Sequence, residues 1–65
     1  MNWDAPSIKY QQDALDLRLF LYATLAGENM DHEAQRFIDL GWIVQNRRSQ
    51  SGYSLTLEGM RARDH

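Results

Sequence analysis

The stretch LGWIVQNRRSQSGYSLTLEG, residues 40–59, decides the fold. Before Gly41 the apolar residues recur with the period of a helix, and after it they alternate with polar residues, as in strands. Residues 42–47 are rich in β-branched and aromatic side chains, and residues 53–57 alternate, so we predict a strand over each range. The polar residues between the two ranges predict a loop, so the strands should pair as an antiparallel hairpin.

The first helix is expected over residues 7–26, where nothing breaks a helix, with Asp4 or Ser7 as its N-cap. Its apolar residues form two adjacent stripes, an arc typical of a helix buried on two sides. One stripe is Ile8, Leu15, Leu19, Tyr22 and Ala26, and the other is Tyr10, Ala14, Leu17, Leu21 and Leu25. Phe20 falls outside both stripes, among the polar residues.

A second helix is expected over residues 31–40, where Gly41 ends it. Thr56 can cap a final short helix over residues 57–63. The chain is therefore predicted to be a single small α+β domain over residues 1–65. It consists of two main helices, a β-hairpin and a short C-terminal helix.

Composition narrows the classes of function. Of 65 residues none is cysteine, and the two histidines, His32 and His65, stand far apart, so no metal site or cofactor is expected. No phosphate-binding loop or nucleophile–base spacing is recognisable, and so short a chain can hardly build a catalytic cleft; we expect no enzyme. The longest apolar run, residues 19–23, is too short for a membrane span, and no signal peptide is read, so a cytoplasmic location is expected.

Charge is distributed unevenly along the chain. Residues 1–45 carry a net charge of −4, whereas residues 46–65 carry +2. Carboxylates held on a rigid scaffold can imitate a run of phosphates and occupy a basic channel of a nucleic-acid-binding complex. The carboxylates expected to form such an acidic helical face are Asp13, Asp16, Glu28, Asp31, Glu33 and Asp39.

A second pattern points to another class of protein. The order of the elements and two short motifs resemble the second half of a winged-helix domain. That order is helix, glycine-containing turn, helix and flexible loop, and the motifs are LGWI at residues 40–43, at the end of the second helix, and YSLTLEG at residues 53–59, after the loop. An ordinary winged helix has three helices before the wing, so the chain resembles a reduced version of that family.

The winged-helix resemblance implies a DNA-binding regulator. Its second helix would turn Gln35 and Arg36 towards the major groove, and Arg47 and Arg48 on the wing would contact phosphate or the minor groove. The acidic residues around Arg36 oppose this reading, because Arg36 can pair with the neighbouring Glu33 or Asp39 within the helix.

In size, acidity and lack of cysteine the chain is also similar to small phage-encoded inhibitors, including anti-CRISPR proteins. We therefore expect a non-enzymatic interaction protein, of phage or mobile-element origin, that inhibits a nucleic-acid-binding complex through its acidic face. A winged-helix transcriptional regulator and a homodimeric structural module are the alternatives. Homodimer contacts are expected on the first helix around Leu17 and Leu21, or around Phe20, because a small domain has few elements to cover two apolar stripes.

Overall fold

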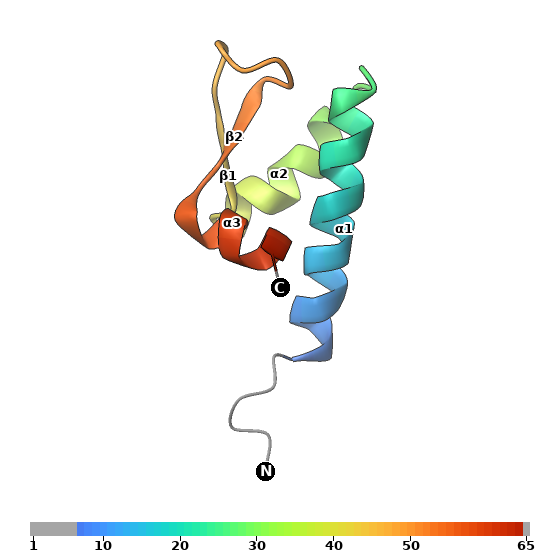
Figure 1. Ribbon diagram of the computed structural model, residues 1–65, viewed down its shortest axis with the longest axis vertical. Coiled ribbons are helices and arrows are strands. Elements are labelled where there is room, and N and C mark those ends of the chain that lie inside the picture. Colours follow the sequence, from blue (N-terminus) through green and yellow to red (C-terminus); the bar gives the residue numbers. More distant parts are fainter. Residues whose placement is uncertain (1–6, 65) are drawn as a thin grey trace.

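The computed structural model describes residues 7–64 and contains three helices and a two-stranded antiparallel sheet within that range. The elements follow in the order α1 (Ile8–Leu25), α2 (Asp31–Asp39), β1 (Ile43–Gln45), β2 (Tyr53–Leu55) and α3 (Leu57–Asp64). Figure 1 shows α1 along one side of the molecule, with α2, the hairpin and α3 all on the same side of it. The predicted α+β arrangement is confirmed.

Short-range signals fix the start of α1 and the ends of both long helices. The Ser7 Oγ accepts a hydrogen bond from the Tyr10 backbone N–H at 3.0 Å; Asp4, the other candidate cap, lies outside the described residues. Gly27 and Gly41 follow α1 and α2 with φ of 87° and 79°, which glycine adopts without steric cost. In each turn two successive N–H groups bond back to the last turn of the helix, which makes a Schellman motif.

The two strands are shorter than the predicted ranges 42–47 and 53–57. They pair in the register Ile43 with Leu55, Val44 with Ser54 and Gln45 with Tyr53. Thr56 ends β2 because its hydroxyl caps α3, accepting a hydrogen bond from the Gly59 N–H at 3.0 Å. At the other end the loop of residues 46–52 closes on the strand: the Ser49 hydroxyl donates to the Tyr53 carbonyl at 2.7 Å.

The core lies where α1 meets α2 and the hairpin. Its largest fully buried side chains are Leu17, Phe20, Phe37 and Ile43. The Phe20 ring centroid lies 5.1 Å from that of Phe37 and 5.8 Å from that of Tyr53, so aromatic contacts tie α1, α2 and β2 together. The expectation that Phe20 lies outside the buried face of its helix is therefore wrong.

α1 is buried on one face and not on two. Its buried residues are Asp13, Ala14, Leu17, Phe20 and Thr24, which lie on a single helix face. Two of the five, Asp13 and Thr24, are polar, so a count of apolar residues placed only Ala14 and Leu17 in a predicted stripe. On the opposite face the side chains are 52–74% exposed, and these are Ile8, Leu15, Leu19 and Tyr22.

α3 comes so close to the start of the hairpin that no side chain fits at Gly59. An added Cβ would overlap the backbone carbonyl of Trp42, which also accepts a hydrogen bond from the Thr56 N–H at 2.9 Å.

Gly59→Ala is therefore expected to lower the free energy of unfolding by about 1–3 kcal/mol, although alanine usually favours a helix over glycine. Thermal and urea denaturation measure the loss. Met60→Ala, at an exposed position of the same helix, should change stability by less than about 0.5 kcal/mol. A stabilised Gly59→Ala variant would contradict the close approach.

Candidate interaction surfaces

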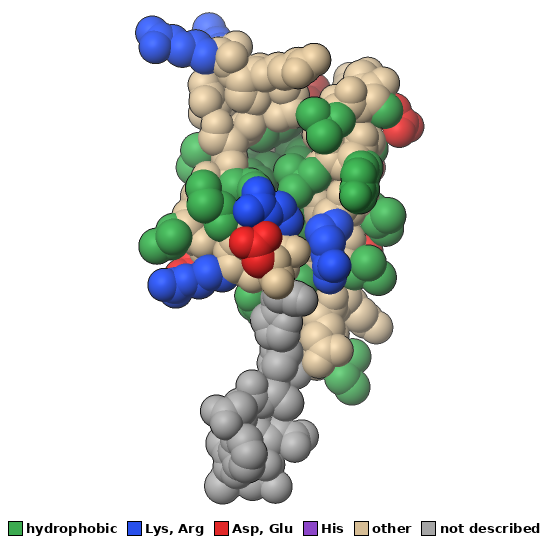
Figure 2. Space-filling model, in the orientation of Figure 1, with side chains coloured by type: hydrophobic (Ala, Val, Ile, Leu, Met, Phe, Trp, Pro, Cys, Tyr) green, Lys and Arg blue, Asp and Glu red, His purple; other side chains and the backbone are tan. Residues whose placement is uncertain are grey.

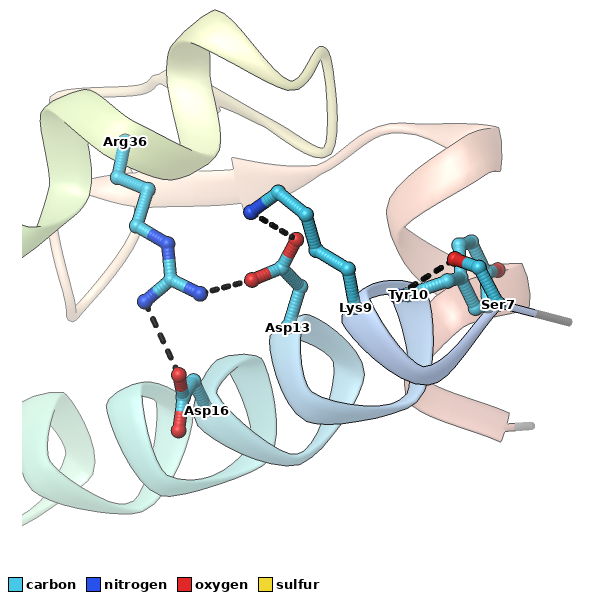
Figure 3. Close-up of polar contacts among 6 residues, drawn as sticks. All are labelled: Ser7, Lys9, Tyr10, Asp13, Asp16 and Arg36. Carbon is cyan, nitrogen blue, oxygen red and sulfur yellow. Dashed lines mark hydrogen bonds and ion pairs between the residues drawn. The ribbon is translucent and has the colours of Figure 1, made fainter.

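An ion-pair cluster joins α2 to the first half of α1. Asp13 of α1 is only 5% exposed, and Arg36 of α2 donates to its carboxylate. Arg36 reaches Asp13 through its Nη2, and its Nη1 donates to the Asp16 Oδ2 at 3.0 Å. Lys9, one turn before Asp13, donates to the second oxygen of Asp13 at 3.3 Å. Figure 3 shows Arg36 extending from α2 towards both carboxylates of α1.

These contacts set the protonation of the cluster. Burial alone would raise the pKa of Asp13, but hydrogen bonds from Arg36 and Lys9, with their positive charges, hold that pKa below its ordinary value of 3.8. Hydrogen bonds to Asp13 and then to Asp16 raise the pKa of Arg36. Asp13 is therefore an anion at neutral pH, held within the fold by two cations.

The cluster removes two carboxylates from the expected acidic face. The expectation that Asp13 lies on an exposed face is wrong, because Asp13 is buried. Asp16 is half exposed, but its carboxylate is already paired with Arg36. Arg36 pairs across to α1 and not with Glu33 or Asp39 on its own helix, so that expectation is wrong too. Across the helices one guanidinium reaches two carboxylates, and such charge-assisted hydrogen bonds are strong.

Four carboxylates remain exposed on the α1–α2 turn and on α2: Glu28, Asp31, Glu33 and Asp39. Two of them accept hydrogen bonds from neutral groups. The Tyr53 hydroxyl donates to Asp31 at 2.9 Å, and this bond raises the pKa of Tyr53. The Gln35 side-chain amide donates to Asp39, also at 2.9 Å.

Glu28 and Glu33 form no ion pair with any residue from 7 to 64. Both line a shallow groove of about 360 Å³ between α1 and α2. Apolar side chains, among them Ala23 and Met30, line the same groove. The structure therefore places two unpaired negative charges beside an apolar surface.

The residues expected to contact DNA do not form one basic surface. On α2, Gln35 and Arg36 are already engaged by carboxylates. Arg47 and Arg48 are exposed on the hairpin loop and make no ion pair within the described part of the chain. Figure 2 shows basic side chains projecting from that end of the hairpin.

Sequence reasoning missed a second groove, which lies between α1, β2 and α3. Its volume is about 390 Å³, and its lining includes Arg18, Leu21, Tyr22, Leu25, Leu55 and Arg63. Figure 2 shows hydrophobic side chains in the hollow between α1 and the hairpin and along α1 beside it. Arg63 pairs with Asp64 at 2.9 Å, whereas Arg18 makes no ion pair within residues 7–64. No local pattern predicts a groove that three separate elements build.

Comparison with protein-family models, with curated proteins and with solved structures finds no match. Within residues 7–64 no helix combines the length and the apolar character that a membrane span requires. The same residues contain no group of three or more histidine, aspartate and glutamate side chains that could hold a metal ion.

Replacing Asp13 is expected to destabilise the protein more than replacing Asp16. Asp13→Ala removes a buried acceptor of two cations and should lower the free energy of unfolding by about 2–3 kcal/mol. Asp16 is half exposed, so solvent screens its ion pair and Asp16→Ala should cost less than about 1 kcal/mol. Urea denaturation of the two variants measures the difference. Equal losses would contradict the assignment of Asp13 as the buried member.

The same carboxylate makes stability depend on pH. Since the pKa of Asp13 is lower in the folded protein than the ordinary 3.8, its contribution is complete above the unfolded value and is lost as pH falls through the folded value. The free energy of unfolding should therefore decrease on acidification below about pH 4. Asp13→Asn should flatten that decrease in urea titrations at a series of pH values. A variant with the pH dependence of the unaltered protein would argue against the cluster.

Proposed function

We propose that this protein is a small non-enzymatic interaction module that binds a basic surface of a partner protein. The observation that carries the proposal is the pair of unpaired carboxylates, Glu28 and Glu33, in one partly apolar groove. The other carboxylates described on α1 and α2 each accept a hydrogen bond from a side chain within the fold. Glu28 and Glu33 are therefore the two carboxylates of this region that no side chain within the fold engages, and Asp31 and Asp39 of α2 stay exposed as well.

The groove suits lysine and arginine side chains. Such side chains lay their methylene stems along apolar surface and keep the charged head at the polar edge. Ala23 and Met30 provide apolar surface, and Glu28 and Glu33 provide acceptors beside it. An arginine can in addition form two parallel hydrogen bonds with one carboxylate.

We infer that the partner is a nucleic-acid-binding complex, because clustered lysine and arginine mark the surfaces that hold nucleic acid. A protein seated on such a surface excludes the nucleic acid, so it acts as an inhibitor. This is the behaviour proposed from the similarity to small phage and mobile-element proteins such as anti-CRISPRs. With Asp13 and Asp16 tied to Arg36, DNA mimicry rests on fewer carboxylates than the sequence indicated.

Charge reversal in the groove tests the proposal. The double variant Glu28→Lys with Glu33→Lys should bind an oligo-arginine peptide at least about tenfold more weakly than the unaltered protein in fluorescence anisotropy at low salt. Circular dichroism should be unchanged, since exposed substitutions alter stability by about 0.5 kcal/mol or less. Binding by the unaltered protein should weaken with salt, which screens charge.

The matched control is Glu58→Lys with Asp64→Lys, which reverses two exposed carboxylates of α3 and changes the net charge equally. This control should keep most of the peptide affinity. If both double variants lose affinity equally, net charge and not the groove is responsible, and the proposal is wrong.

DNA binding through the hairpin loop is the second candidate, favoured by the exposure of Arg47 and Arg48. This candidate predicts that the unaltered protein binds a random-sequence DNA duplex in the same assay, whereas a protein that acts through its acidic groove should not bind it. A duplex that binds the unaltered protein and is released by Arg47→Ala with Arg48→Ala would support this candidate. A duplex that does not bind would contradict this second candidate.

A further inference from the structure

The outer face of α1 carries a regular apolar pattern that no element covers within residues 7–64. Its residues are Ile8, Gln12, Leu15, Leu19, Tyr22 and Ala26. The steps between them alternate between four and three residues, which is the a/d spacing of a two-stranded coiled coil. The large apolar members are 52–74% exposed. A stripe with this spacing is suited to receive another helix along its full length.

We propose that α1 of a second copy of this chain packs on this stripe, parallel and in register, and forms a two-fold symmetric dimer. In Figure 1, α2, the hairpin and α3 all lie on the other side of α1, so the described fold leaves this face open for a partner helix. The buried residues Leu17 and Phe20 cannot serve, so the dimer contact expected around them moves to the opposite face of the helix.

The exposed area is large enough for a dimer. Five long side chains lie on the stripe or next to it: Ile8, Leu15, Leu19, Tyr22 and Leu25, each more than half exposed. Together they expose roughly 600 Å² of apolar surface, at the upper end of what a monomer usually shows. A standard interface takes about 800 Å² from each partner, so this apolar surface would supply a large part of one.

Gln12 fixes the register. It is the one polar residue in the stripe between Ile8 and Ala26, and it occupies an a position. In a parallel, in-register pair the two Gln12 side chains lie opposite each other across the two-fold axis, and their amides can hydrogen-bond to one another. In any other register each Gln12 would lie opposite an apolar residue and would lose these hydrogen bonds. A single polar a residue is known to select register and number of strands in coiled coils.

Sedimentation velocity over a range of concentrations tests the dimer. The unaltered protein should sediment with twice its monomer mass of 7.6 kDa at high micromolar concentration. Leu15→Glu with Leu19→Glu should raise the dimer dissociation constant at least about a hundredfold, because it buries like charges in the contact. Circular dichroism of this variant separates loss of the dimer from loss of the fold.

The matched control is Leu57→Glu with Met60→Glu, two exposed apolar residues of α3, and it should leave the dimer intact. An unaltered protein that remains monomeric at high micromolar concentration overturns the proposal. The groove variants at Glu28 and Glu33 should still dimerise, so failure of the dimer and failure of the proposed function are distinguishable.

Cysteine cross-linking tests the orientation, and the chain contains no cysteine of its own. Gln12→Cys should form a disulfide with itself under mild oxidation, because a parallel pair brings the two Cα atoms within about 7 Å, the usual limit for a bridge. An antiparallel pair would bring Gln12 of one copy to Tyr22 of the other. If Gln12→Cys stays reduced while a mixture with Tyr22→Cys forms the mixed disulfide, the parallel arrangement is wrong.

Discussion

The position of α2 on α1 depends on Arg36. One guanidinium bridges Asp13 and Asp16 on α1 and also lies 5.2 Å from the ring centroid of Phe37. α2 has nine residues, of which only Ala34 and Phe37 are buried, and so short a helix is not stable alone in water. The charged contacts and the packing of Phe37 against Phe20 together hold α2 on α1. The hairpin then closes the core with Ile43.

The cluster also divides the surface of the molecule. It neutralises Asp13 and Asp16, the carboxylates of α1 that face α2, so the acidic side chains that stay exposed are Glu28, Asp31, Glu33 and Asp39, on the turn after α1 and on α2. The apolar stripe of α1 lies on the face turned away from the core. The groove and the stripe adjoin one another, because Leu19 of the stripe also lines the groove.

The order of the elements could be predicted from the sequence because it rests on local signals. Gly27 and Gly41 end helices, Ser7 and Thr56 begin them, and the change of period at Gly41 separates helix from strand. The orientation of α1 could not be predicted in this way. Asp13 and Thr24 belong to its buried stripe, and a wheel that sorts residues by polarity sends them outward. Asp13 is buried only because Arg36 arrives from another element, and no periodicity within α1 contains that information. For the same reason the acidic face predicted from the sequence was too large: Glu28, Asp31, Glu33 and Asp39 stay exposed, whereas Asp13 is buried and Asp16 is paired with Arg36.

The loop of residues 46–52 is held by hydrogen bonds within itself and to β2. The Asn46 side chain accepts the Arg48 N–H at 3.0 Å, and the Asn46 N–H donates to the Gly52 carbonyl at 2.8 Å. These hydrogen bonds lie within the hairpin, and extending a surface loop costs little, about 0.6 kcal/mol for each doubling of its length. This makes the loop tip a natural point of attachment. A foreign peptide or a reporter group can be grafted there, and the protein becomes a compact, cysteine-free display scaffold whose other surfaces stay intact.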